Sequence, residues 1–329
     1  STATGFSTFG QCIILALIQL GALALLVFGS FVAALMLGRL PHGNRAANRA
    51  ESANTLERDA MRTSARRLAV KVVLVTLAIE AVGVMALLGI SFGAADGGTL
   101  GERLAASAFH AVSALTNAGF DVSGHSLIDH RYAASAHAVI LPLIVLGGLG
   151  MPVLFEIGSR LRRRGGKPTQ DTASKRETPR ALSTYARLVL TTTGVLYVFG
   201  LLAIAGGQLT PHVYDWLGMG VTAHAEEAGS LSVAGLARLL ADSSFLALSA
   251  RSAGFTTMPI DQLEPGGQLA VMALMLIGGS PASVAGGVKT AAVAALGLAA
   301  LDALRGGMRV PRRFAGWCLR LAGVVAAYL

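Results

Sequence analysis

Long apolar runs separated by short polar stretches dominate this chain of 329 residues. Five of the runs are long enough to form a membrane-spanning helix, which needs about 20 apolar residues. They are 11–38, 69–93, 136–158, 185–207 and 267–300. A sixth run begins near Phe314. The pattern predicts an all-α integral membrane protein.

Two shorter stretches are too short to span a membrane. Leu104–Leu115 and Leu236–Ala250 are amphipathic, and each leads directly into the tripeptide Ala-Gly-Phe. A segment of this length is typical of a re-entrant half-helix, which enters the membrane and turns back.

The two short stretches belong to an internal repeat. Phe109–Phe120 aligns with Phe245–Phe255 when one residue is inserted, and the same order of elements surrounds both copies. Each copy consists of a spanning helix, a half-helix, a glycine turn and a second spanning helix. We therefore expect parallel helix–pore-loop–helix repeats, related by an axis along the membrane normal.

The run 267–300 is interrupted in its middle. Four glycines and Pro281 fall within residues 277–290, a composition that breaks a helix. Broken backbone at membrane depth is tolerated where it lines a cavity, so this segment is a candidate gate. The alternative interpretation is a simple kink between two packed helices.

Composition agrees with a membrane protein. Hydrophobic residues make up 53% and charged residues 14% of the chain, and its mean hydropathy is +0.61. Soluble domains carry about 25% charged residues. Disordered, collagen-like and disulfide-rich proteins are excluded on the same grounds, and the two cysteines suggest neither a disulfide framework nor a metal site.

The charge distribution predicts the orientation of the chain. Three blocks, Arg39–Lys71, Arg160–Arg187 and Lys289–Arg320, hold 23 of the 27 basic residues. The stretches 94–132 and 208–265 hold ten of the 18 acidic residues. Basic loops remain in the cytoplasm, so the net charge of +9 indicates contact with membrane lipid and gives no reason to expect a nucleic-acid partner.

The turns that follow the half-helices are the candidate chemistry. Backbone carbonyls there have no helical partner, and a ring of such carbonyls can replace the hydration shell of a monovalent cation. Gly119 and Gly254 permit the backbone angles that would direct carbonyls to an axis. The negative end of each half-helix dipole also favours a cation.

These motifs resemble those of the Trk/Ktr/HKT potassium transporters. Thr-Asn-Ala-Gly-Phe-Asp (116–121) and Arg-Ser-Ala-Gly-Phe-Thr-Thr (251–257) are similar to the pore-loop signatures of that family. The segment 277–290 is similar to its glycine-rich stretch, and Leu17–Gly21 and Leu146–Gly150 fit its first and second repeats. Ala282 and Val284 depart from the Gly and Thr usual there, which suggests a stiffer gate.

The resemblance implies that the repeats surround a central cation pathway, and it implies a site and a function. The function is potassium translocation across the plasma membrane through a glycine-centred filter, above an intramembrane gate loop. The implied filter residues are Thr116, Asn117, Ala118, Gly119, Phe120, Ser252, Ala253, Gly254 and Phe255. The implied gate residues are Gly278, Gly279, Ser280, Pro281, Ala282, Ser283, Gly286, Gly287 and Lys289. K⁺ is the transported ion, and we expect no cofactor in this chain and no metal beyond a monovalent cation.

The resemblance also implies partners and a division of the chain. We expect a multi-pass protein of the plasma (inner) membrane that forms a homodimer on a cytosolic nucleotide-binding regulatory ring. The predicted segments are 1–40 (end of repeat 1), 41–68 (linker), 69–160 (repeat 2), 161–183 (linker), 184–305 (repeat 3) and 306–329 (start of repeat 4). On this view the chain is a fragment lacking most of repeats 1 and 4. Gly5 then lies in the linker after the first filter, although the filter itself is an alternative place for it.

Two other functions stay open from the sequence. One is a secondary transporter of another solute, with the broken helix as its substrate site. The other is a fragment with no transport function. An enzyme is not expected, because no nucleophile and base can be paired. Glu80 lies in a spanning helix, where acidic residues are rare; we expect it to pair with a neighbouring repeat.

Overall fold

A computed structural model describes residues 2–36, 51–90, 99–133, 135–165, 182–216 and 233–304. Within these ranges the regular structure is helical, apart from one isolated bridge between Ile277 and Val288. The helices are α1 (Thr2–Gly5), α2 (Thr8–Met36), α3 (Glu51–Gly89), α4 (Leu100–Leu115), η2 (Ile128–His130), η3 (Ser135–Ile140), α5 (Leu141–Leu149), α6 (Met151–Gly165), α7 (Thr184–Trp216), α8 (Val233–Ser249), η5 (Ile260–Gln262), α9 (Pro265–Met275) and α10 (Thr290–Leu304).

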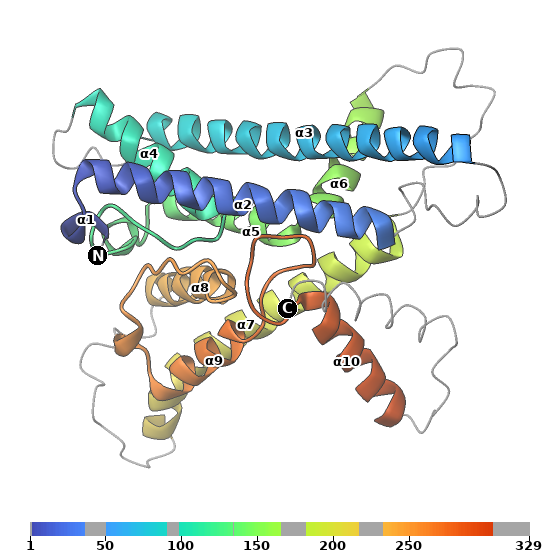
Figure 1. Cartoon of the computed structure of the whole chain (residues 1–329). Helices are drawn as coiled ribbons and strands as arrows, with labels where there is room; N and C mark the ends of the chain where they lie inside the picture. Colours follow the sequence, from blue (N-terminus) through green and yellow to red (C-terminus); the bar gives the residue numbers. More distant parts are fainter. Residues whose placement is uncertain are drawn as a thin grey trace.

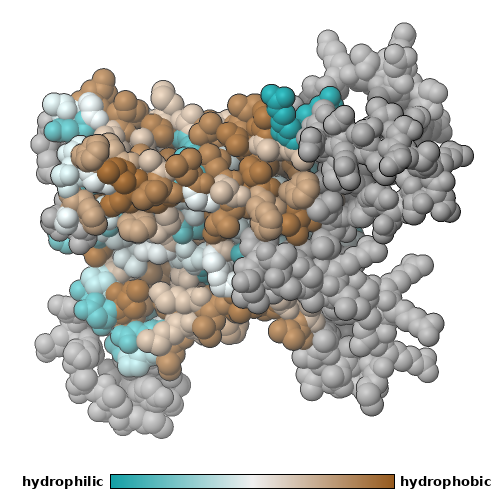
Figure 2. All heavy atoms as spheres, viewed as in Figure 1, coloured by the Kyte–Doolittle hydropathy of each residue, from teal (hydrophilic) through white to brown (hydrophobic). Residues whose placement is uncertain are grey.

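Three helices are long and apolar enough to cross a membrane. They contain the segments Thr8–Ala34 in α2, Ser64–Gly89 in α3 and Thr184–Leu209 in α7. Helices α2 and α3 lie side by side along one face of the molecule (Figure 1), and apolar side chains cover much of that face (Figure 2). Exposed leucine, valine and phenylalanine side chains on these helices are suited to contact with lipid tails. The three predicted spans at these positions are confirmed.

The predicted span at 136–158 is not one continuous helix but a bent pair of helices. The chain forms η3 and α5, then turns by 110° at Gly150 into α6. Gly150 has φ 79° and ψ 150°, angles that favour glycine. An apolar run indicates that a segment is removed from water, but it does not indicate the direction in which the chain runs. The sequence pattern therefore did not reveal this elbow.

The two short helices are confirmed as α4 and α8. Helix α4 packs between α3 and α5, and α8 packs against α7 and α9, so both copies of the repeat have the same arrangement. The two copies also share a core, in which Leu115 and Ile144 of the first copy pack with Phe245 and Phe255 of the second. This shared core brings the two glycine turns together.

The polar connections are described only in part. Helix α3 begins at Glu51, so the predicted linker 41–68 is partly helical. Helix α6 extends the second copy to Gly165, while 166–181 lie outside the described residues. The predicted run from Phe314 also lies outside them. Gly5 ends α1 with open space around it.

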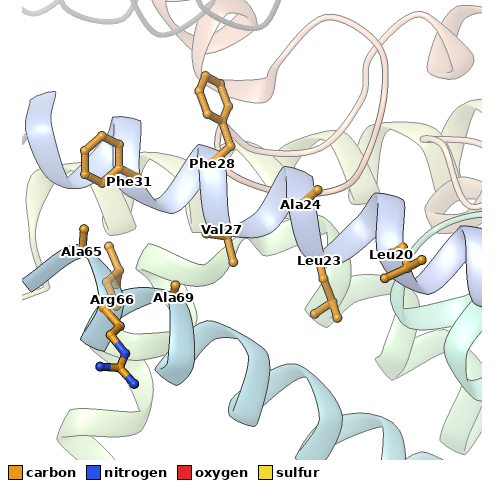
Figure 3. A pocket seen from close by; sticks show the side chains of 10 residues that line it. Leu20, Leu23, Ala24, Val27, Phe28, Phe31, Ala65, Arg66 and Ala69 are labelled. Atoms are coloured by element: carbon orange, nitrogen blue, oxygen red, sulfur yellow. The ribbon is translucent and has the colours of Figure 1, made fainter. Parts of the chain in front are cut away.

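A groove lies on the surface between α2 and α3 (Figure 3). Nine of its ten lining residues are apolar, and Arg66 is the tenth. None of the ten is a candidate filter or gate residue. The groove is therefore separate from the site described next.

Candidate ion pathway

The C-terminal end of α4 is in close contact with α5. Thr99 and Glu102 form a capping box at its N-terminus, which fixes where the helix starts. At its other end, a Cβ atom placed on Gly147 of α5 would collide with the Leu115 carbonyl and lie 2.6 Å from Asn117 Nδ2. Gly147 therefore allows α5 to pack directly against the turn after α4.

The two Ala-Gly-Phe turns meet at their glycines. A Cβ atom on Gly119 would lie 2.7 Å from the Ala253 carbonyl oxygen and 3.0 Å from the Gly254 Cα. A Cβ atom on Gly254 would lie 3.1 Å from the Gly119 Cα. Segments separated by more than 130 positions in the sequence are thus in backbone contact, with no room for a side chain between them.

The two turns have the same unusual backbone. Asn117 and Gly119 have φ values of 51° and 71°, and Ser252 and Gly254 have values of 111° and 77°. In an extended strand successive carbonyls point to opposite sides, and a positive φ at every second residue breaks that alternation. The turns therefore differ from both helix and strand in the same way.

A serine restrains each turn from its half-helix. Ser113 Oγ donates to the Phe120 carbonyl at 2.7 Å, and Ser249 Oγ donates to the Phe255 carbonyl at 2.5 Å. Ser113 and Ser249 occupy matched positions in the repeat, so the aligned sequences carry a signal for this role. The bonds hold the two phenylalanine carbonyls toward the half-helices.

Further contacts join the two copies on the side where α4 and α8 begin. Leu127 N donates to the Thr256 carbonyl at 3.0 Å, and Thr256 N donates to Ser126 Oγ at 3.0 Å. Arg131 makes a two-pronged ion pair with Asp242 of α8, with Nε–Oδ1 and Nη2–Oδ2 distances of 2.9 and 2.7 Å.

The Arg131–Asp242 pair is reinforced by its neighbours. Tyr132 donates a hydrogen bond to Asp242 Oδ2 at 3.1 Å, and the Arg131 guanidinium carbon lies 5.2 Å from the centre of the Tyr132 ring. The hydrogen bonds to Asp242 raise the pKa of Arg131 above its ordinary value, and burial raises the pKa of Tyr132. This pair fixes the loop after the first turn to the half-helix before the second.

The broken helix is confirmed, with its break between α9 and α10. The segment that leaves α9 lies beside the segment that enters α10. Gly278 N donates to the Val288 carbonyl oxygen, and Val288 N donates to the Leu276 carbonyl oxygen, each at 3.0 Å. Residues 279–287 form a loop closed by this neck. A Cβ atom on Gly278 would collide with the Gly286 carbonyl, so the neck requires glycine.

This loop is inserted into the elbow at Gly150. Ser280 N donates to the Gly148 carbonyl at 2.9 Å, and Ser280 Oγ donates to the Leu149 carbonyl at 2.5 Å. Tyr185 of α7 donates to the Pro281 carbonyl at 2.9 Å. Two helices, α5 and α7, therefore hold the loop, and its first half, from Gly278 to Ser283, is buried.

One side chain links the second glycine turn to the loop. Arg251, which is 7% exposed, donates from Nη2 to the Gly278 carbonyl at 3.0 Å. Lys289 Nζ donates to the Ala285 carbonyl at 2.6 Å within the loop. The glycine-rich motif pointed to Lys289, whereas no local pattern pointed to Arg251, because the partner of Arg251 lies 27 residues away along the chain.

The predicted site residues thus form two clusters. The filter candidates, from Thr116 to Phe120 and from Ser252 to Phe255, lie in the touching turns. The gate candidates, from Gly278 to Lys289, lie in the closed loop and at its neck. Arg251 joins the clusters. Glu156, in contrast, has a structural role, since it accepts hydrogen bonds from Ser183 N and Oγ at the start of α7.

Comparison with known proteins identifies the family. The TrkH family, described as "Cation transport protein", matches residues 1–308. Ktr system potassium uptake protein D of Bacillus subtilis (strain 168) is 28% identical over 310 residues, covering 94% of this chain and 61% of that protein. The potassium/sodium uptake protein NtpJ of Enterococcus hirae is 26% identical over 294 residues, covering 88% of this chain and 55% of that protein.

The fold has a counterpart among solved structures. The potassium transporter TrkH from Vibrio parahaemolyticus has a TM-score of 0.50 and 15% identity, over 90% of this chain and 50% of that one. At this identity the likeness shows the fold alone. The chain spans little more than half the length of the relatives it matches. With a family match over nearly all of its length and several apolar helices, the chain is a multi-pass membrane protein that belongs to the TrkH family of cation transport proteins.

Proposed function

We propose that this chain forms part of a pathway that carries K⁺ across the plasma membrane, and that it acts as a transporter and not as an enzyme. The observation that carries this proposal is the contact between the two turns at Gly119 and Gly254, with positive φ at matched positions. The relatives named as potassium uptake proteins support K⁺ as the cargo. The relative named for both potassium and sodium makes K⁺ over Na⁺ selectivity a point to test.

The filter in this proposal is made of backbone oxygens. Residues Thr116–Phe120 and Ser252–Phe255 would line the pathway, and carbonyls turned out of the helix would replace water around the ion. The bonds from Ser113 and Ser249 occupy the two phenylalanine carbonyls. We therefore assign the ion contacts to carbonyls earlier in each turn.

The gate in this proposal is the loop between α9 and α10. Its insertion at the Gly150 elbow supports a constriction beneath the filter, and Lys289 would anchor it through the Ala285 carbonyl. Ions would pass when the bonds from Ser280 and Tyr185 release the loop.

Partners follow from the same proposal. The chain would work as a homodimer of pores on a cytosolic nucleotide-binding ring, in contact with membrane lipid, with no cofactor of its own. Two of the relatives are named as Ktr system proteins, which supports a multi-component assembly.

The test is rubidium uptake by the complete reading frame in cells that lack their own potassium uptake. Gly119→Val places a branched side chain where no Cβ fits, so we expect uptake to fall to background while the protein still inserts. Gly194→Val is the control, because no atom lies within 4 Å of a Cβ atom at that helical position. Equal uptake in wild type and Gly119→Val would contradict the filter assignment.

A further inference from the structure

Glu80 is an acidic residue inside a membrane-spanning helix. It lies near the middle of the apolar segment Ser64–Gly89 of α3, and only 5% of it is exposed. Its Oε2 atom accepts a hydrogen bond of 2.9 Å from Nε2 of Gln19 on α2. This contact joins the end of repeat 1 to repeat 2, and it confirms the expectation that Glu80 pairs with a neighbouring repeat.

The pair leaves two buried oxygens without partners. Neither Glu80 Oε1 nor Gln19 Oε1 has a hydrogen-bond donor among the described residues. A buried carboxylate with a single hydrogen bond would cost free energy, because a charge removed from water is stabilised only when it is paired with an opposite charge and fully hydrogen-bonded. The site therefore lacks one hydrogen-bond donor or one positive charge.

Charged groups on the neighbouring elements do not supply this missing donor or positive charge. On α4, Arg103 donates to the Leu88 carbonyl near the end of α3, and His110 Nδ1 lies 2.8 Å from the Ala106 carbonyl. On η3, His137 Nε2 contacts the Arg131 carbonyl, and on α6, Glu156 is bonded to Ser183. Helix α2 carries no acidic or basic side chain between Thr8 and Met36. Along α3 itself, Lys71 is nine residues away, about 13 Å.

We propose that Glu80 and Gln19 form a proton-binding site inside the membrane, in which Glu80 is held as the neutral acid. A carboxylic acid and a primary amide can form a closed pair with two hydrogen bonds. Gln19 Nε2 donates to Glu80 Oε2, as observed, and a proton on Glu80 Oε1 donates to Gln19 Oε1. One proton therefore removes the buried charge and satisfies both orphaned oxygens.

A proton fits this site better than a metal ion does. Hard cations take many oxygen ligands, whereas the pair offers two free oxygens. Among the described residues no group of three or more His, Cys, Asp or Glu side chains could hold a metal ion. A single proton needs only the two atoms that are present.

The site lies at the level of the inner end of α4. Gly83, one turn from Glu80, faces Ala111 of α4, since a Cβ atom there would lie 3.3 Å from the Ala111 Cβ. Arg103 contacts Leu88 and Ala111 contacts Gly83, so the two helices run in opposite directions and Glu80 lies near the level of Leu115, just before the first glycine turn. If water reached this contact, the acid would ionise and a negative charge would appear near the base of that turn.

The test is infrared spectroscopy of the purified full-length transporter in liposomes. At pH 7 an exposed glutamate, with a pKa of about 4.3, is ionised. We therefore expect wild type to show the carbonyl band of a protonated acid and Glu80→Gln to lose it, since glutamine has the same size without a proton to lose. Glu102→Gln is the control, because Glu102 is exposed at the start of α4, and this exchange should leave the band unchanged.

Two more measurements decide between the alternatives. Gln19→Leu removes the acceptor, so the acid band should shift in frequency. An unshifted band would overturn the pairing. Loss of a carboxylate band in Glu80→Gln, with no change in the acid band, would overturn the neutral acid. An acid band that appears only when Na⁺ and K⁺ are replaced by a bulky organic cation would assign the site to a metal ion instead. None of these results depends on transport, so they are independent of the filter assignment.

Discussion

Ala282 has a φ of 62°, in the left-handed region that residues with a Cβ atom rarely adopt. It lies in the loop between α9 and α10, at a position where glycine is usual in the family that the sequence resembles. Asn117 and Ser252 have positive φ values in the two glycine turns as well. Single residues at the site are thus held in costly conformations by the packing around them.

Replacing Ala282 by glycine should relieve this strain. We expect Ala282→Gly to raise the free energy of unfolding by about 1 kcal/mol, measured by reversible denaturation in mixed micelles. Ala285→Gly is the matched control in the same loop; its φ is not positive, so it should lower stability by about 0.5–1 kcal/mol. A loss of stability in both variants would contradict the strain assigned to Ala282.

Arg251 also acts at the residue scale. Its hydrogen bond to the Gly278 carbonyl is buried and comes from a charged group, and such bonds are worth about 1.5–3 kcal/mol. Arg251→Gln should lower the free energy of unfolding by that amount and reduce rubidium uptake. Arg238→Gln, at an exposed position of α8, should cost less than about 1 kcal/mol. If the two variants proved equally stable, the hydrogen bond from Arg251 to the Gly278 carbonyl would contribute nothing to stability.

At the scale of elements, the helices are positioned by where glycine lets backbones touch. Gly147 permits α5 to reach the end of α4, and Gly150 permits the turn of 110° into α6. The loop between α9 and α10 then occupies the space that the elbow opens. The arrangement of α5, α6 and this loop therefore depends on two glycines in one short segment.

Two adjacent glycines provide a matched test of this packing. Gly147→Ala places a Cβ atom against the Leu115 carbonyl, so we expect a loss of about 1–3 kcal/mol in stability. Gly148→Ala has nothing within 4 Å and should stabilise the helix by up to about 1 kcal/mol. Thermal unfolding of the two variants beside wild type measures both effects. Equal melting temperatures would mean that α5 can move away from α4 without cost.

The whole molecule is oriented by charge. The basic blocks predict that the loop after the first glycine turn faces outside and that α6 faces the cytoplasm. With Cys12 and Cys318 replaced by serine, Ser123→Cys should react with a membrane-impermeant maleimide in intact cells. Ser159→Cys, exposed on α6, should react only after the cells are permeabilised. Labelling of both in intact cells would contradict the orientation.

Local patterns predicted much of this protein. The length of the apolar runs located α2, α3 and α7, because crossing hydrocarbon requires a set number of apolar residues. The repeat located both half-helices, and the glycines and Pro281 located the break between α9 and α10. Each of these features is specified by residues that are neighbours in the chain.

The tertiary structure alone decided the contacts between distant segments. It brought Gly119 into contact with Gly254 and Arg251 into contact with Gly278. It also paired Glu80 on α3 with Gln19 on α2. It also turned the run 136–158 into an elbow, because the positive φ of Gly150 and the inserted loop are properties of the packed chain. Composition and periodicity report how buried a segment is, whereas the partner of a buried polar group is fixed only when the helices pack.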